Sequence, residues 1–109
     1  MSEEKFQINY LPSAKKDLEN IINYIQKDDP DAALNLLNKI DKSISQLKTY
    51  PLKGKIPEDD HLQSKGYRML VVENYIVFYI VFENKKEVEI RRIIHGKRKY
   101  TFLLWFFNK

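Results

Sequence analysis

The sequence predicts an α+β fold with an N-terminal strand, a two-helix hairpin and then a three-stranded antiparallel meander, the helices being packed on one face of the sheet. Three features of its 109 residues support this prediction. Apolar and polar residues alternate at the start, apolar residues then recur at helical spacing as far as residue 50, and three strand-like apolar runs follow one another closely in the second half. The length is typical of one domain, so we expect residues 1–109 to fold as a single unit.

The first expected elements are a strand and a helical hairpin. Residues 6–10 alternate between apolar and polar side chains, which is the pattern of a half-buried strand. Ser13 is a candidate N-cap for an amphipathic helix over 13–28. Asp29 precedes a proline and is the candidate N-cap of a second amphipathic helix over 30–50. The apolar stripes of the two helices are expected to form one side of the core.

The second half is expected to contain a long loop and the meander. Residues 51–66 hold two prolines and two glycines without clear periodicity, which predicts a loop. Residues 67–72, 75–83 and 87–95 are predicted strands joined by short turns. The middle strand is apolar on both faces, so both faces of the sheet need a cover. The helices cover one face, and we expect the apolar tail 100–109, another subunit or a segment of a partner to cover the other.

Composition excludes several classes of site. The chain has no cysteine, which rules out disulfides, thiolate zinc sites and a cysteine nucleophile. Its two histidines, His61 and His95, lie far apart in the sequence, so no metal site and no cofactor are expected. The N-terminus is acidic where a signal peptide is basic, and no apolar run reaches the length of a membrane helix. We therefore expect a cytoplasmic protein that does not enter a membrane.

Positive charge is concentrated in the second half of the chain. Residues 1–60 carry 9 basic and 11 acidic groups, whereas residues 61–109 carry 10 basic and 4 acidic groups. All the arginines lie in this second half, at Arg68, Arg91, Arg92 and Arg98. Guanidinium groups suit phosphates and carboxylates, so this half predicts a surface for nucleic acid or for an acidic protein. A solvated basic face without a ligand is the alternative.

Strand pairing predicts which of these side chains share a face. A two-residue turn before the middle strand would place Arg68 opposite Tyr79, and a three-residue loop after it would place Arg91 opposite Tyr79 from the other side. One face of the sheet would then carry Arg68, Tyr75, Tyr79, Arg91 and His95. Arg98 would lie close beyond the strand end. The same parity places Arg92 with the apolar residues of the last strand, on the face expected to pack in the core.

Such a face suits a phosphodiester. Metal-free RNA cleavage needs a base for the 2′-hydroxyl, positive donors for the phosphorane and an acid for the leaving oxygen. His95 could supply the acid or the base, and the arginines the positive charge. The alternative is structural, with His95 an ordinary strand-end residue. Arg68 and Arg91 would then pair with glutamates across the strands.

Four motifs follow one another along the chain, namely Leu47-x-x-Tyr50-Pro51-x-x-Gly54, Gly66-x-Arg68-x-Leu70-x-Val72, Asn74-Tyr75-x-x-Phe78-Tyr79 and Val88-x-Ile90-x-Arg92-Ile93-x-His95-Gly96-x-Arg98. In this order and spacing, and with the expected elements over residues 6–100, the chain resembles the RelE/ParE superfamily of bacterial toxins. The resemblance implies the growth-arresting toxin of a type II toxin–antitoxin pair, held inactive by a cognate antitoxin.

The superfamily divides by molecular target. RelE-type members cut mRNA on the ribosome, and ParE-type members poison DNA gyrase. RelE-type nucleases commonly have an arginine after the tyrosine that opens the middle strand, whereas Ile76 follows Tyr75 here. The motifs around Arg68 and His95 look more like the ParE branch. We therefore expect a ParE-like gyrase inhibitor, with a RelE-like ribosome-dependent mRNA endoribonuclease and an inactive, antitoxin-binding co-repressor as alternatives.

The candidate site residues follow from these alternatives. A nuclease would use His95, Arg68, Arg91 and Arg98. Phosphate or target binding would involve Arg68, Arg92, Lys97, Arg98 and Tyr100. An antitoxin or another partner would contact Tyr75, Tyr79, Trp105 and Phe106. The aromatic tail either covers the sheet as a strand or short helix, or contacts a partner.

Overall fold

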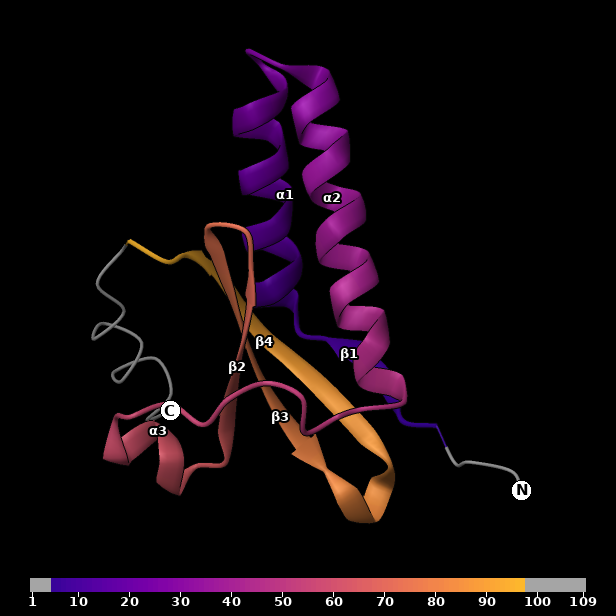
Figure 1. Ribbon diagram of the computed structural model, residues 1–109, viewed down its shortest axis with the longest axis vertical. Helices are drawn as coiled ribbons and strands as arrows, with labels where there is room; N and C mark the ends of the chain where they lie inside the picture. The colour runs from indigo at the N-terminus through magenta and orange to yellow at the C-terminus, as the bar shows by residue number, and fades with distance from the viewer. Residues whose placement is uncertain (1–4, 98–109) are drawn as a thin grey trace.

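The structure is a computed structural model that describes residues 5–97, and it consists of a four-stranded mixed sheet with a helical hairpin on one face (Figure 1). The elements in chain order are β1 (Gln7–Tyr10), α1 (Pro12–Gln26), α2 (Pro30–Ser45), the 3-10 turn Gln46–Lys48, α3 (Asp60–Ser64), β2 (Tyr67–Val72), β3 (Tyr75–Phe82), the 3-10 turn Glu83–Lys85 and β4 (Glu87–His95). The strand order is β1-β4-β3-β2, in which β1 runs parallel to β4 and the other pairs are antiparallel. The predicted α+β fold is confirmed.

The helices begin close to the predicted positions, with one difference in capping. Asp29 caps α2, since its Oδ1 accepts a hydrogen bond of 3.1 Å from the Ala32 amide. Ser13 does not cap α1, because that helix starts at Pro12 after Leu11 without a side-chain cap. Proline suits this first position, since it has no amide hydrogen that would need a partner.

The main core lies between the helical hairpin and the sheet. α2 contributes Ile40 and Ile44 to this core, the turn after it contributes Leu47, and all three side chains are buried. They pack with Val77 and Tyr79 of the middle strand. Beyond this core the hairpin extends past the sheet, as Figure 1 shows, so its tip is held by contacts between α1 and α2.

The second face of the sheet is covered by a segment for which the sequence predicts a loop. Within residues 51–66, α3 places Leu62 against Phe78 and its neighbours on this face. The sequence signal for the helix is Asp59, whose Oδ1 accepts a hydrogen bond of 2.9 Å from the Leu62 amide. The prediction of a loop throughout this segment is therefore wrong. The tail that we expected as a possible cover, residues 100–109, lies outside the described residues.

A β-bulge in β4 changes the faces predicted for its arginines. Tyr79 pairs with Ile90, and the next pair along the two strands is Phe78 with Arg92. Arg91 is the extra residue between these pairs, so the predicted pairing of Tyr79 with Arg91 is wrong. An extra residue reverses the alternation of faces beyond it. Arg92 therefore lies beside Phe78 of the second face, and its predicted place in the main core is also wrong.

Two other pairs have the predicted register. Arg68 pairs with Tyr79, and Tyr75 pairs with His95. These four residues share the face of the sheet that carries the helices. Arg91 instead lies on the second face, where its guanidinium is 5.4 Å from the centre of the ring of a buried tyrosine, Tyr67.

Tyr79 fastens the start of the 51–66 segment to the sheet. Its side chain is fully buried, and its hydroxyl donates to Pro51 O at 2.9 Å and accepts from Gly54 N at 2.8 Å. Only glycine fits at position 54, because a Cβ there would lie 2.6 Å from the Tyr79 hydroxyl oxygen and 2.7 Å from Met69 O. Buried in this way, Tyr79 does not offer the predicted partner contact.

Replacing Tyr79 by phenylalanine is expected to lower the free energy of unfolding by about 1–3 kcal/mol, because Gly54 N and Pro51 O lose their partner. Tyr50→Phe is the matched control. The Tyr50 side chain is exposed, so its loss of a hydroxyl is expected to change the same free energy by less than about 0.5 kcal/mol. Urea unfolding followed by circular dichroism measures both variants. Equal stability of Tyr79→Phe and the parent chain would contradict this role of the hydroxyl.

Candidate functional site

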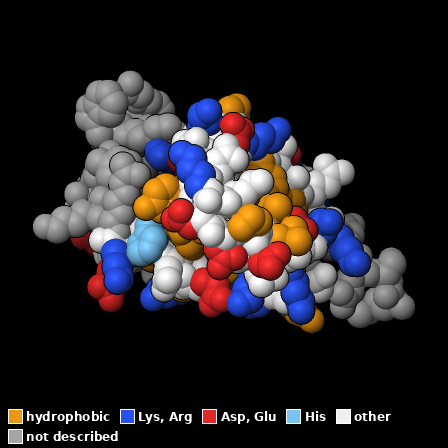
Figure 2. Space-filling model, turned by 90° about the horizontal axis from the view of Figure 1, so that it is seen from above, with side chains coloured by type: hydrophobic (Ala, Val, Ile, Leu, Met, Phe, Trp, Pro, Cys, Tyr) orange, Lys and Arg blue, Asp and Glu red, His pale blue; other side chains and the backbone are white. Residues whose placement is uncertain are grey.

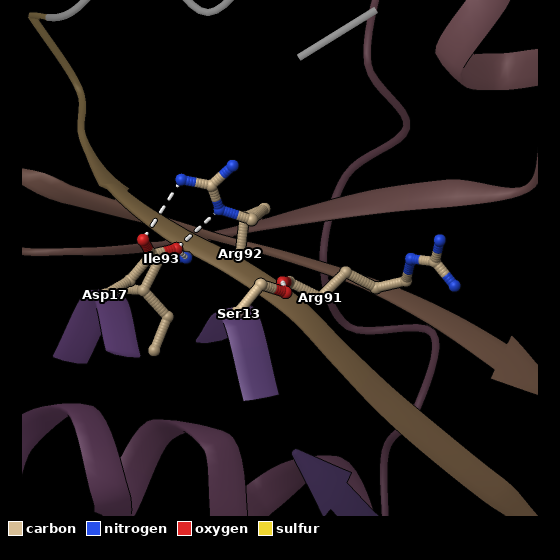
Figure 3. A network of polar contacts seen from close by, with 5 residues as sticks. All are labelled: Ser13, Asp17, Arg91, Arg92 and Ile93. Atoms are coloured by element: carbon tan, nitrogen blue, oxygen red, sulfur yellow. Dashed lines mark hydrogen bonds and ion pairs between the residues drawn. The ribbon is translucent and has the colours of Figure 1, made fainter. Parts of the chain in front are cut away.

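Helix α1 takes the place of a strand along part of the edge of β4. β1 pairs with residues 87–90, and no strand among the described residues pairs with that edge further on. There the Ser13 hydroxyl donates to Arg91 O at 2.8 Å (Figure 3). The Ile93 amide donates to Asp17 Oδ2 at 2.9 Å. Two side chains of one helix thus satisfy main-chain groups that a neighbouring strand would otherwise satisfy.

The Asp17 carboxylate also binds the guanidinium group of Arg92. Arg92 Nε donates to Asp17 Oδ2 at 2.7 Å, and Arg92 Nη2 donates to Asp17 Oδ1 at 3.0 Å. Both side chains are only 15% exposed, so solvent ions screen the pair weakly. In Figure 3 the Arg92 guanidinium turns toward Asp17, whereas Arg91 points away from it. Arg92 is therefore engaged inside the fold.

The other two arginines of the described chain are held at separate places. Arg68 Nη1 donates to Gly54 O at 2.8 Å, in the loop between α2 and α3. Arg91 Nη1 lies 2.6 Å from Glu89 Oε1, in the same strand, and the Arg91 guanidinium lies over the Tyr67 ring. The predicted gathering of arginines on one face of the sheet is therefore wrong for residues 5–97.

A cleft of about 320 Å³ lies between α1 and the adjoining ends of β3 and β4. His95 and Tyr75 form its sheet side, and their ring centres are 5.2 Å apart in an edge-to-face arrangement. Asn20 and Tyr24 line it from α1. His95 Nδ1 accepts a hydrogen bond of 3.0 Å from the Lys97 amide, so the neutral imidazole carries its proton on Nε2.

The cleft lies beside the exposed part of the helical hairpin. Figure 2 looks onto this end of the molecule and shows hydrophobic side chains between acidic and basic ones, with a histidine near them. Tyr24 and Leu34 are among the large apolar side chains exposed on the hairpin. The site thus combines an imidazole, two tyrosines and exposed apolar surface, which suits contact with another macromolecule.

The structure brings together two of the predicted site residues, Tyr75 and His95. Lys97 follows them in an exposed turn. Sequence reasoning missed Asn20 and Tyr24, whose signal is an exposed polar and an exposed aromatic residue one helical turn apart on α1. The remaining predicted site residues lie outside the described residues, and they are Arg98, Tyr100, Trp105 and Phe106.

Two kinds of feature are absent from residues 5–97. In this range no three side chains of His, Cys, Asp or Glu come together as a metal site. No helix in the same range is long and apolar enough to cross a membrane.

The fold is shared with solved structures of bacterial toxins. The structure of the chromosomal ParDE TA system from P. aeruginosa superimposes with a TM-score of 0.70 at 21% identity, over 87% of this chain and 100% of that chain. The toxin–antitoxin complex RelBE2 from Mycobacterium tuberculosis gives a TM-score of 0.60 at 19% identity, over 86% and 94% of the two chains. The isolated E. coli RelE toxin gives 0.53 at 12% identity, over 94% and 97%. At these identities the likeness shows the fold alone.

Sequence comparison identifies the family within this class of fold. Residues 8–100 match the family described as "ParE toxin of type II toxin-antitoxin system, parDE". The chain is also 30% identical over 98 residues to "Putative toxin Y4kP" of Sinorhizobium fredii, which covers 90% of this chain and 96% of that protein. The chain therefore belongs to the ParE toxin family of type II toxin–antitoxin systems. The resemblance to the RelE/ParE superfamily, and to its ParE branch, is confirmed.

Asp17→Ala is expected to lower the free energy of unfolding by about 3 kcal/mol, because the largely buried Arg92 would lose its carboxylate and the Ile93 amide its acceptor. Glu73→Ala is the control, since Glu73 pairs with Lys39 at the surface and such pairs contribute less than about 1 kcal/mol. Urea unfolding measures both variants. Similar losses in the two variants would contradict a special role for Asp17.

Alkaline pH is expected to weaken the fold through Tyr67. Burial raises the pKa of Tyr67 from 10.0 to about 12, although the Arg91 guanidinium opposes the shift. The unfolded chain therefore ionises at lower pH than the native chain, so the stabilising contribution of Tyr67 is complete below about pH 10 and is lost as the pH rises toward 12. Tyr67→Phe is expected to flatten the fall of stability over this range, measured by urea unfolding at successive pH values. An unchanged slope would contradict the assignment.

Proposed function

We propose that this ParE-family toxin arrests growth by binding DNA gyrase and inhibiting supercoiling, and that a cognate antitoxin holds it inactive. The family match supports the antitoxin, since the family is described by its type II toxin–antitoxin system. The M. tuberculosis relative is likewise described as a toxin–antitoxin complex. The choice of gyrase over RNA rests on the arginines of this chain.

One observation carries that choice, namely that each arginine of residues 5–97 is engaged with a different partner within the chain. Cleavage of RNA without a metal requires several cationic or donor groups that converge on one phosphate. The three arginines are instead bound to loop carbonyls, to Glu89 and to Asp17. Moving any of them onto a phosphate would break the contact that it makes within the chain. This arrangement favours a toxin that binds its target over one that cleaves RNA.

Position 76 supports the same choice. Ile76 follows Tyr75, where RelE-type nucleases commonly carry an arginine. Its side chain is buried on the second face of the sheet, with Phe78 and Ile94. An apolar side chain in this position supplies neither charge nor hydrogen bonds to a phosphate.

The cleft favours a second candidate, a ribosome-dependent mRNA endoribonuclease. An imidazole can donate or accept a proton near neutral pH, and the ring of Tyr75 lies against that of His95. In this alternative His95 is the general acid or base. Lys97 and Arg98, which follow it closely in the sequence, would supply the positive charge.

Two assays on the purified chain separate these candidates. In the first, gyrase supercoils relaxed plasmid DNA in the presence of increasing amounts of toxin, and we expect inhibition that grows with toxin concentration. In the second, mRNA 5′ ends are mapped after addition of the toxin to translating ribosomes, and we expect no new ends.

His95→Ala is the diagnostic variant for the second assay. Cuts in phase with codons that disappear in His95→Ala, together with unaffected gyrase, would overturn the proposal in favour of the nuclease. A chain that affects neither assay and does not arrest growth on expression would instead be an inactive homologue, which acts by binding its antitoxin.

A further inference from the structure

An apolar pocket, here called the basal pocket, is lined by residues of the chain segments that Figure 1 shows at the end of the molecule opposite the tip of the helical hairpin. It has a volume of about 930 Å³ and lies between the start of β1, the segment after α2 and the turn between β3 and β4. Its lining includes Phe6, Tyr50, Leu52, Lys53, Glu83 and Lys86. The volume lies in the range of pockets that accept a ligand or a bulky side chain. None of these residues belongs to the cleft around His95.

The basal pocket presents exposed apolar side chains on an anchored backbone. Tyr50 is 66% exposed and Leu52 is 51% exposed. The Pro51 carbonyl nevertheless accepts a hydrogen bond from Tyr79, and the Leu52 carbonyl accepts one from Arg68. A ligand would therefore order little additional backbone on binding, which lowers the entropic cost of association. Exposed apolar surface of this kind indicates contact with another molecule.

Lysines line the basal pocket beside this apolar surface. Lys53 is hydrogen-bonded to Gln46 at the pocket wall. Lys86 Nζ lies 5.1 Å from the centre of the Phe6 ring. Glu83 is the acidic residue of the lining, so positive charge outweighs negative charge there. A ligand with carboxylates is therefore attracted and a cationic one repelled.

We propose that the basal pocket binds an acidic peptide segment of another protein, which inserts a bulky apolar side chain between Tyr50 and Leu52 and places carboxylates near Lys53 and Lys86. The apolar anchor supplies most of the affinity, and the carboxylates set the orientation. A second copy of this chain fits less well, because a symmetric contact would bring the lysines of the two copies together. The proposal concerns this surface alone and holds whether gyrase or mRNA is the toxin's target.

A random peptide library displayed on phage and selected on the folded chain tests the proposal. We expect enriched peptides that combine acidic residues with at least one large apolar residue. A synthetic copy of the most enriched peptide is then titrated by fluorescence anisotropy. Lys53→Glu and Leu52→Ala are each expected to weaken its binding about tenfold or more. Lys27→Glu, an exposed change next to the far end of α1, is the matched control and is expected to bind as the parent chain does.

Several outcomes would overturn the proposal once circular dichroism has shown that the variants are folded. These are no enrichment, enriched peptides without acidic residues, and equal binding by Lys53→Glu. A concentration-dependent dimer in sedimentation that Leu52→Ala abolishes would assign the pocket to a second copy. Binding to vesicles of anionic phospholipid that Lys53→Glu removes, without peptide binding, would assign it to a lipid surface.

Discussion

The carboxylate of Asp17 connects the helical layer to the sheet, and the position of the cleft depends on it. Apolar packing alone holds a helix on a sheet without fixing its place along a strand, since such contacts are not directional. Asp17 removes this freedom, because its Oδ2 accepts from both Ile93 N and Arg92 Nε while its Oδ1 accepts from Arg92 Nη2. The first turns of α1 are thereby fixed against the last part of β4. Tyr24 then lines the same cleft as His95.

The bulge at Arg91 makes this connection possible. Before the bulge, the main-chain groups of Ile90 face β1, as the hydrogen bond from the Leu11 amide to the Ile90 carbonyl shows. In a regular strand every second residue would face the same edge, but here the amide of Ile93, three residues on, faces that edge and meets Asp17. The extra residue changes the parity of the strand. It also places two adjacent arginines on the second face, where Arg91 pairs with Glu89 and Arg92 with Asp17 of α1.

Periodicity in the sequence predicts the elements well, because strand alternation and helical stripes are local properties. The pairing of Arg68 with Tyr79 follows from them directly. Periodicity does not predict very short helices or single inserted residues. α3 has five residues, too few to show an apolar stripe, and one added residue in β4 leaves the alternation intact on each side of it. The partners of the arginines are the feature that the sequence predicts least. Asp17 and Arg92 lie 75 positions apart in the chain, so composition predicts the charge but not the group that neutralises it.

The pairing of β1 with β4 has a consequence for how the protein is made. β1 is the first strand of the described fold and β4 is the last, so neither can pair until the chain between them has been synthesised. The Asp17 carboxylate also cannot form its hydrogen bonds before β4 is available, because both of its partners belong to β4. A nascent chain whose β4 is still inside the ribosomal exit tunnel can pair β2 with β3, but it lacks the β1–β4 pair and the cleft. The cleft around His95 therefore forms only after β4 has emerged, and not gradually as the chain grows.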